Sequence, residues 1–566
     1  MNIFKYIAFS IFFANSIFLA DVVGVQVQSL AIALQTNARP VISGFANSCD
    51  KDQVMSARFL TDGTFDGTYN GTGYNLTLFG GSAFGKAITV QPSDQKIVVA
   101  GFSDDSIGVL RFTTGGVLDT AFGTGGRVNL NLGLNETGNA VTMQSSKILV
   151  AGNATVGGVT QFFVTRLNAN GALDTGFGTT GFTTTPIGDG CAANAMGLQS
   201  NGKIILGGVA VVSGQVVFAA ARYSTSGVLD TTFGVSGTTS AVVGDFGVGN
   251  SLAVDGSNRI VIAGFAISGG VHQVAVVRFT SNGTLDGSFG TSGVVLHDIP
   301  STDIDHGLGV AIQADGQIVV AGSSGTDALV MRLDGTDGSL DTTFGGGAGY
   351  VLTTIGDVAA ATAVVIQPAD QMIVITGISD LSAFIARYDV DGNLDVTFGG
   401  SGTGYNINPE GSLEALCGTC TVCATGPQGP TGIASLGSYA YFYNSTLSLD
   451  LSLSATSAIP YDSEGIKNNI THSTVTNTDQ ITIVSDGVYK ITAVVDLVTA
   501  SENTDFGLLR NGVVIPGSTL SLIGVGTVVL QATFIASAAD VIQVAELGGG
   551  SSTVTGQTTF TIEQIA

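Results

Sequence analysis

Seven arginine–aspartate pairs are the most regular charged feature of this sequence. Each aspartate follows its arginine by eight residues, except that Asp341 follows Arg332 by nine. A carboxylate beside a guanidinium could serve acid–base chemistry, but an active site occurs once and this pair occurs seven times. We therefore expect a partly buried ion pair that ties a strand end to the following turn, within or between repeating units. The pairs are Arg58–Asp66, Arg111–Asp119, Arg166–Asp174, Arg222–Asp230, Arg278–Asp286, Arg332–Asp341 and Arg387–Asp395.

A cluster of histidines and carboxylates lies in the segment HDIPSTDIDH at residues 297–306. Imidazole and carboxylate groups so close in sequence could bind Ca²⁺ or a transition-metal ion. A solvated acidic loop accounts for the same residues equally well, and the chain has only four histidines in all. The candidate metal ligands are His297, Asp298, Asp303, Asp305 and His306.

A second candidate site is the segment DVDGNLD, whose alternating oxygen-bearing side chains imitate a Ca²⁺-binding loop. The equivalent turns of other units read TTGG, NANG and STSG, which favours ordinary turn residues. We therefore expect no cofactor, with Ca²⁺ as the alternative. We also predict no catalytic residue, because common hydrolase, zinc-protease and phosphate-loop motifs do not occur. The residues concerned are Asp389, Asp391, Asn393 and Asp395.

The composition points to an all-β protein with more than one domain. The chain has 566 residues, of which 81 are glycine and 11% are charged. Many short apolar strands joined by tight glycine turns would account for this composition. The net charge of −24 argues against nucleic acid as a partner, because phosphate binding needs clustered lysine and arginine. Two of the five cysteines, Cys49 and Cys191, stand alone, and we expect buried free thiols there without assigning a pairing.

The N-terminus has the pattern of a secretory signal peptide, assigned to residues 1–22. Lys5 precedes an apolar run that ends at Leu19, and small residues suited to cleavage follow. A retained membrane anchor is the alternative, but the run is short for a spanning helix and no basic stop signal follows it. We expect the mature protein to be secreted or held at the cell surface, without a transmembrane span.

A heptapeptide recurs with a period of 53 to 56 residues and defines the elements that must position the charged pairs. It reads VLDTTFG at 228–234, and the other copies resemble it closely. Each period also holds a strand similar to KIVVAG, a second strand that ends in arginine and an apolar residue, and two further strands. We expect the phenylalanine to fill the gap between units and the glycine after it to adopt a positive φ.

Four strands per period and seven periods predict a seven-bladed β-propeller over residues 23–408. Blades packed between two neighbours explain why KIVVAG is apolar on both faces. One strand-like segment, GTGYNIN at 402–408, is left over after the seventh unit. We expect this segment to complete the first blade, whose own first strand would fall within the signal peptide, and so to close the ring by strand exchange.

These motifs resemble the delta-60 repeat, a β-propeller repeat of secreted bacterial proteins. The resemblance rests on the pattern G-x-LDxxFG followed by a KIVVAG strand, and it covers roughly residues 25–408. It implies the propeller fold, in agreement with the strand count, and it implies no particular activity.

Residues 409–432 are predicted to be a linker rich in cysteine and glycine. Cys417, Cys420 and Cys423 follow the spacing C-x₂-C-x₂-C, which lacks the fourth ligand of an iron–sulfur site. Glycine at every third position from 426 to 432 is the collagen pattern. In an exported chain this combination predicts disulfides between three chains.

Residues 433–566 lack the heptapeptide and resemble the C1q/TNF-like jelly roll, especially the domain that caps collagen-like glycoproteins of bacterial spore surfaces. The match rests on residues 487–489, 511–512 and Asp540, although Ala539 replaces the glycine usual in that family. The resemblance implies a ten-stranded β-sandwich that forms a homotrimer through aromatic inner strands. A place in the protomer core is the alternative for each interface candidate. These candidates are Tyr441, Tyr443 and Tyr489.

Together these features predict an exported, non-enzymatic protein for adhesion or multivalent recognition of a surface protein or glycan. Three weak sites on one trimer would act together through avidity. One alternative is an extracellular propeller enzyme with a metal-assisted site in the loop 297–306. Another alternative is a structural coat component.

Overall fold

The computed structural model describes residues 27–48, 51–104, 106–132, 134, 136–300, 304–380 and 382–407, together with the backbone of the strands between 439 and 564. The chain divides into two compact units, Met1–Thr425 and Gly426–Ala566. Several predictions fall outside the described residues: the signal peptide 1–22, the linker 409–432 with Cys417, Cys420 and Cys423, and also Cys49, Asp303 and Tyr443. The side chains of Tyr441 and Tyr489 lie outside them as well.

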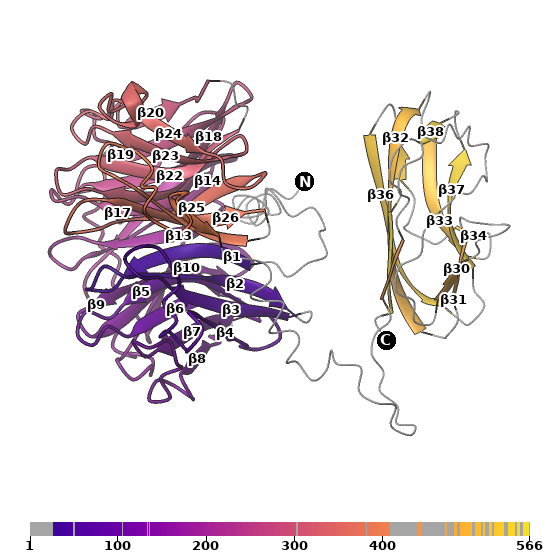
Figure 1. The fold of residues 1–566 in the computed structure, drawn as a ribbon, viewed down its shortest axis with the longest axis horizontal. Coiled ribbons are helices and arrows are strands. Elements are labelled where there is room, and N and C mark those ends of the chain that lie inside the picture. Colours follow the sequence, from indigo (N-terminus) through magenta and orange to yellow (C-terminus); the bar gives the residue numbers. More distant parts are fainter. Residues whose placement is uncertain are drawn as a thin grey trace. The chain divides into compact units, whose positions relative to one another are not determined.

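Seven antiparallel sheets of four strands each form the blades of the first unit (Figure 1). The strands of each sheet pair in chain order, so every blade is one continuous stretch of sequence. Blade 1 contains β1 (Val27–Leu34), β2 (Pro40–Ser48), β3 (Lys51–Arg58) and β4 (Tyr74–Thr77); blade 2 contains β5 (Ala83–Val90), β6 (Ile97–Ser103), β7 (Ser106–Phe112) and β8 (Arg127–Leu130); blade 3 contains β9 (Thr137–Gln144), β10 (Lys147–Val156), β11 (Val159–Leu167) and β12 (Phe182–Thr185).

The remaining blades repeat the same plan. Blade 4 contains β13 (Gly190–Leu198), β14 (Ile204–Val212), β15 (Gln215–Tyr223) and β16 (Thr238–Ala241); blade 5 contains β17 (Phe246–Val254), β18 (Ile260–Ser268), β19 (Val271–Phe279) and β20 (Val294–His297). Blade 6 contains β21 (Asp305–Ile312), β22 (Ile318–Ser324), β23 (Asp327–Leu333) and β24 (Tyr350–Thr353); blade 7 contains β25 (Ala359–Ile366), β26 (Ile373–Ser379), β27 (Ser382–Tyr388) and β28 (Tyr405–Ile407). A single 3₁₀ turn at Gly345–Gly347 precedes β24.

The blades form a closed ring. The first strand of each blade contacts the first strands of both neighbours, and β1 also contacts β25 and β26 of the last blade. Figure 1 shows the indigo β1 beside the orange β25 and β26. The predicted seven-bladed propeller with four-stranded blades is therefore confirmed.

The predicted closure by strand exchange is wrong. The segment that contains β28 pairs with β27 of its own blade, not with blade 1. Blade 1 takes its first strand from Val27–Leu34, which pairs with β2. The position that the segment from the far end was expected to fill is therefore already occupied by β1. The ring closes by packing one complete blade against another.

The hydrophobic core is divided among the boundaries between blades. All seven residues of β7 and six of the seven in β6 are buried, as expected for strands covered on both faces. Each cluster of buried side chains draws on two adjacent blades. At the closure of the ring, Ile42 and Met55 of blade 1 share a cluster with Val374 and Ile385 of blade 7.

The Phe-Gly end of each heptapeptide lies at these boundaries, as predicted. The six phenylalanines, and Tyr69 in the first unit, have no exposed surface. The glycine after each phenylalanine has a positive φ, and Asn70 takes that conformation in the first unit. In this conformation Gly234, for example, donates its backbone N–H to the carbonyl of Asn282 in the next blade, at 2.8 Å. The heptapeptide thus connects each blade to its neighbour.

The second unit is described at the level of its strands. One sheet has the order β29 (Tyr439–Phe442), β39 (Thr559–Gln564), β32 (Gly487–Ala500) and β36 (Gly526–Ala536), with β38 (Ser552–Val554) beside β32. The other has the order β30 (Ile470–His472), β31 (Gln480–Ile483), β37 (Val541–Gly548), β33 (Thr504–Arg510) and β34 (Val513–Val514), with β35 (Leu520–Leu522) beside β33. None of the helices in the described part of the chain has the length and apolar character that crossing a membrane requires.

Candidate functional site

The seven predicted Arg–Asp pairs are all present. In every pair the arginine Nε donates to the aspartate Oδ2 at 2.7–2.8 Å. The Nη1 of the same arginine donates to a backbone carbonyl in the next blade, and Arg387 of blade 7 reaches Thr61 of blade 1 at 2.6 Å. The carbonyls that accept these bonds belong, from blade 1 to blade 7, to Thr114, Ala169, Thr225, Ser281, Gly335, Val390 and Thr61.

Each guanidinium also lies over the aromatic ring of its own heptapeptide. The distance from the guanidinium carbon to the ring centroid is 4.2–4.9 Å for the six phenylalanines and 5.1 Å for Tyr69. We call the arginine, the aspartate and the aromatic ring of one unit an interblade latch. Since all seven copies have the same contacts, the repeated aspartate has a structural role and orients an arginine that holds the next blade.

Additional hydrogen bonds keep the latch aspartates ionised. Burial alone would raise the pKa of Asp230, but hydrogen bonds from Lys203 and Thr232 and the charge of Arg222 hold it well below the ordinary value of 3.8. The hydrogen bond from Lys147 has the largest effect on Asp174 and lowers the pKa of that carboxyl as well. The latch pairs are therefore ionised at neutral pH.

A second set of contacts joins the first strands of the blades. A bulge in each first strand places one residue out of the regular register, and several of these residues bond to the next blade. Asn139 and Asn194 donate to the carbonyls of Ala193 and Gly249. Lys86 donates to Asn139, and burial lowers the pKa of Lys86 to about 8. The bulge residues are Leu30, Lys86, Asn139, Asn194, Asn250, Leu308 and Thr362.

The described members of the first metal-ligand set do not converge on an ion. Asp305 and His306 are successive residues of β21 and therefore point to opposite faces of the sheet. The Oδ2 of Asp305 accepts a hydrogen bond from the backbone N–H of Ile299 at 2.7 Å. His297 lies on β20 of the preceding blade, with its ring 6.0 Å from that of Tyr350. The described residues, which include Asp298, contain no group of three or more His, Cys, Asp or Glu side chains that could hold a metal ion.

The second metal-ligand set forms an ordinary turn. Asp389 Oδ1 accepts hydrogen bonds from the backbone N–H groups of Asp391 and Asn393. The side-chain amide of Asn393 donates to the other carboxylate oxygen of Asp389. Asp395 is the latch partner of Arg387. The alternation of acidic residues reflects turn chemistry, since these oxygens already accept bonds from the turn itself.

His306 has a partner that the sequence did not reveal. Its Nε2 lies 3.0 Å from Nδ1 of His272 in blade 5, and the ring of Phe265 packs 4.2 Å away. Burial, followed by the nearby His272, lowers the pKa of His306 to about 3. The pKa of His272 is also lowered by burial, although Asp305 opposes that shift. Both rings are therefore neutral at pH 7 and share one hydrogen bond across the blade boundary.

Cys191 is a free, buried thiol, as expected. It lies on β13 and accepts a hydrogen bond from the backbone N–H of Phe162 at 3.2 Å. Burial raises the pKa of the Cys191 thiol to about 12, so the reactive thiolate is not formed at neutral pH.

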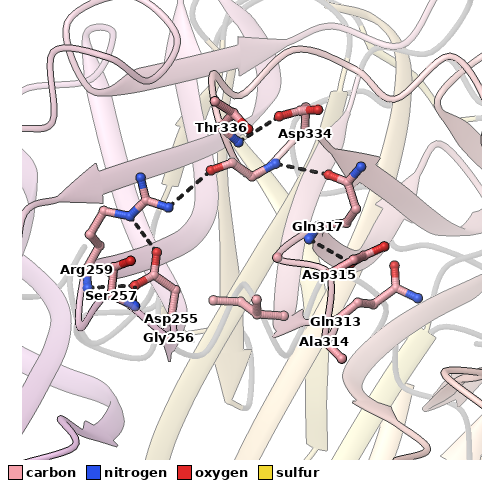
Figure 2. A pocket seen from close by; sticks show the side chains of 13 residues that line it. Asp255, Gly256, Ser257, Arg259, Gln313, Ala314, Asp315, Gln317, Asp334 and Thr336 are labelled. Carbon is pink, nitrogen blue, oxygen red and sulfur yellow. Dashed lines mark hydrogen bonds and ion pairs between the residues drawn. The ribbon is translucent and has the colours of Figure 1, made fainter.

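A cavity of about 390 Å³ lies between blades 5 and 6. Figure 2 shows Asp255 and Arg259 on one side of it, Gln313 and Asp315 on the opposite side, and Asp334 and Thr336 at the far end. Three turns form its wall: one after β17, one after β21 and one after β23. The residues that line it are Asp255, Gly256, Ser257, Arg259, Ile312, Gln313, Ala314, Asp315, Gly316, Gln317, Asp334, Gly335 and Thr336.

The sequence motifs did not predict this cavity, although the sequence carries two traces of it. The spacing of nine residues between Arg332 and Asp341, against eight elsewhere, marks an extra residue in one of its turns. Asp255 is the other trace, because it stands where the other blades have glutamine.

Comparison with known proteins supports the propeller. The family model described as a β-propeller domain of unknown function, DUF5122, matches residues 93–122, 144–177, 199–233, 256–289 and 313–344. These five segments correspond to units of the repeat and agree with the predicted fold. A search of curated proteins found no match.

Several solved structures resemble parts of the chain at low identity. Sqt1 from Chaetomium thermophilum is 14% identical, with 68% of this chain and 87% of that chain covered and a TM-score of 0.39. The globular domain of zebrafish complement 1qA protein is 10% identical, with 23% of this chain and 98% of that chain covered and a TM-score of 0.17. Eiger TNF from S. frugiperda is 14% identical, with 23% of this chain and 92% of that chain covered and a TM-score of 0.18. At these TM-scores the likenesses assign neither fold nor function.

Removing one latch arginine should destabilise the propeller. Arg222→Met removes the bonds to Asp230 and to the Ser281 carbonyl, and it leaves a carboxylate that is only 11% exposed. We expect the free energy of unfolding to fall by about 2 kcal/mol, because the bond to the next blade and one of the charged partners of Asp230 are lost, while Lys203 and Thr232 still bond to that carboxylate. Urea unfolding followed by circular dichroism measures this change. The control is Arg127→Met, whose side chain makes one exposed bond to Gly125, and an equal loss in both variants would contradict the latch.

The buried histidine should make stability depend on pH in a defined window. The unfolded chain binds a proton at His306 near pH 6.5 whereas the folded chain does so only near pH 3, so stability is full above pH 6.5 and is lost as the pH falls. The loss from this residue is up to about 1.4 kcal/mol per pH unit. In His306→Gln the free energy of unfolding should change less steeply with pH between pH 6.5 and 4.5, a range that lies above the pKa of ordinary aspartates. Equal slopes for the two proteins would refute the assignment.

Proposed function

We propose that this chain is an exported, non-enzymatic recognition protein in which the propeller binds a surface protein or a glycan. The observation that carries the proposal is the contrast between the latches and the turns. The latches repeat the same contacts seven times and fix the blades, whereas the turn residues that line the cavity between blades 5 and 6 differ from the repeat. A rigid scaffold that displays variable turns is typical of proteins that bind.

Export is proposed on the basis of the N-terminal sequence. Lys5 and the apolar run after it have the order of a signal peptide. The proposed C1q/TNF-like jelly roll at 433–566 and the glycine repeat at 426–432 support a trimer. Three propellers on one trimer would bind a surface through several weak contacts at once, which raises the apparent affinity without any new contact.

The trimer should be held by disulfides between chains. On a denaturing gel without reductant, the full chain is expected to run at three times the mass of the reduced chain. The variant Cys417→Ser, Cys420→Ser, Cys423→Ser should run as a single chain under both conditions. Cys191→Ser is the control and should keep the trimer band, because Cys191 is a free, buried thiol. A single-chain band for the unreduced native protein would contradict the disulfides between chains.

Recognition is tested by the binding of the full chain to a panel of immobilised polysaccharides and extracellular-matrix proteins, measured by biolayer interferometry. Multivalent binding predicts that the apparent affinity for a bound surface rises by about 100-fold or more from sparse to dense immobilisation. An affinity that does not change with density would contradict multivalency. A lack of binding to every surface of the panel would overturn the recognition role.

A further inference from the structure

We propose that the cavity between blades 5 and 6 binds an uncharged, hydroxyl-rich ligand, with the chemistry of one monosaccharide unit. This inference rests on the proposed recognition function and names the ligand class of the propeller. Departures from the repeat create the cavity, and polar groups from both blades face it.

The first departure is the loss of a bridging amide. Six blades carry glutamine at the end of the first strand, and four of these side chains donate to the next blade. At the boundary between blades 4 and 5, Gln199 Nε2 donates to the carbonyls of Asn258 and Ser281, both at 3.0 Å. Blade 5 has Asp255 at this position, which cannot donate and instead accepts a bond from Arg259 at 2.5 Å. The six glutamines are Gln35, Gln91, Gln144, Gln199, Gln313 and Gln367.

The second departure, which blade 4 shares at Gly202, is the loss of the side chain that reaches back across the boundary. Asn258 Oδ1 of blade 5 accepts a bond from the backbone N–H of Ser200 in blade 4, at 2.6 Å. Gln371 of blade 7 does the same for Ala314 of blade 6, at 2.8 Å. The equivalent residue of blade 6 is Gly316, and a Cβ there would have no atom within 4 Å. The space that a bridging side chain fills at those two boundaries is therefore open at this one.

The third departure is the longer turn of blade 6. The extra residue between Arg332 and Asp341 places Gly335 against Gly316, where a Cβ would lie 1.9 Å from the Gly316 carbonyl oxygen. Arg278, which has no exposed surface, donates to the carbonyls of Gly335 and Thr336 and fixes this turn. Three departures from the repeat thus meet at a single cavity whose wall is held in place.

The polar groups that face the cavity include both acceptors and a donor. Asp315 Oδ1 accepts a bond from Gln317 N–H and Asp334 Oδ1 accepts one from Thr336 N–H, which leaves the second oxygen of each carboxylate for a ligand. The guanidinium of Arg259 is 30% exposed; its Nε donates to Asp255 and its Nη2 to the Gly335 carbonyl, and its remaining N–H groups supply the donor. Adjacent hydroxyls can donate to the carboxylates and accept from the guanidinium at the same time.

Charge and size favour an uncharged ligand of this class. An anion would meet the carboxylates of Asp255, Asp315 and Asp334, which outnumber the guanidinium of Arg259. A cation could pair with the carboxylates but could not accept a hydrogen bond from the guanidinium. A neutral polyol avoids the repulsion that an anion meets, and its hydroxyls can donate to the carboxylates and accept from the guanidinium. The volume of about 390 Å³ lies within the range of small-molecule sites and accommodates one sugar ring.

The decisive experiment restores the repeat at this boundary in the full chain. The double variant Asp255→Gln, Gly316→Asn supplies the two side chains that close the boundary between blades 4 and 5. Asparagine tolerates the positive φ of 93° at Gly316 better than most residues, so we expect the variant to remain folded, and a cooperative thermal transition checks this. Saturation-transfer NMR with free methyl glycosides of glucose, galactose and mannose should show binding to the native chain and none to this variant.

A single substitution with a matched control separates the ligand contact from fold effects. Asp315→Asn keeps the acceptor for the backbone bond but removes the negative charge, and it should weaken glycoside binding about tenfold or more. Asp370→Asn is the control in blade 7, because Asp370 makes the equivalent bond to Met372 N–H at 3.1 Å and lies outside the cavity. Equal affinity in the two variants would overturn the proposal.

Further outcomes separate this inference from the function on which it rests. Binding of spermidine at the cavity without binding of any glycoside would overturn the hydroxyl-rich ligand. Glycoside binding that persists in the double variant would do the same. If the chain captures matrix proteins but no saccharide, the inference fails while the recognition role stands. Methyl glycosides that bind together with immobilised oligosaccharides identify a glycan terminus as the source, whereas binding of the free glycoside alone identifies a soluble sugar.

Discussion

The bond from each latch arginine to the next blade is the interaction on which the propeller depends. A blade of four strands is buried on both faces, so it is stable only while its neighbours remain in place. The arginine meets this requirement because one end of its guanidinium binds the aspartate of its own blade while the other reaches a backbone carbonyl across the boundary. Seven such bonds lead back to blade 1, where Arg387 binds Thr61. The ring is therefore fixed by a repeated polar contact in addition to its apolar core.

The latches account for much of the chain's small supply of positive charge. The chain has 19 lysine and arginine residues against 43 acidic ones. Besides the seven latch arginines, five more basic residues approach a latch aspartate within 4.0 Å. Arg259 differs from the others, since its Nε binds Asp255 and only its Nη1 lies 3.6 Å from Asp286. Arg259, which faces the cavity, is thus only distantly paired with the latch aspartate Asp286.

A repeat protein can form a specific site by departing from its repeat at one boundary. The departures at Asp255, Gly316 and the turn of blade 6 lie apart in sequence, and the first two remove side-chain contacts that bridge the blades at other boundaries. Their effects meet because neighbouring blades bring equivalent turns to the same face of the ring. The pair of His272 and His306 follows the same logic, since the two residues belong to adjacent blades and are 34 positions apart.

The sequence by itself determined the number of blades, the strands within them and the partners of the repeated charges. These features depend on local pattern and fixed spacing, so the period, the apolar runs and the offset of eight residues were sufficient. Only the tertiary structure decided how the ring closes, which histidine meets His306, and that Asp305 and His306 point to opposite faces of their sheet. The physical reason is that these features depend on contacts between blades, where a one-residue change of register reverses the side-chain direction. The cavity belongs to the same class, because the sequence shows an altered residue and only the packing of two blades shows the space it leaves.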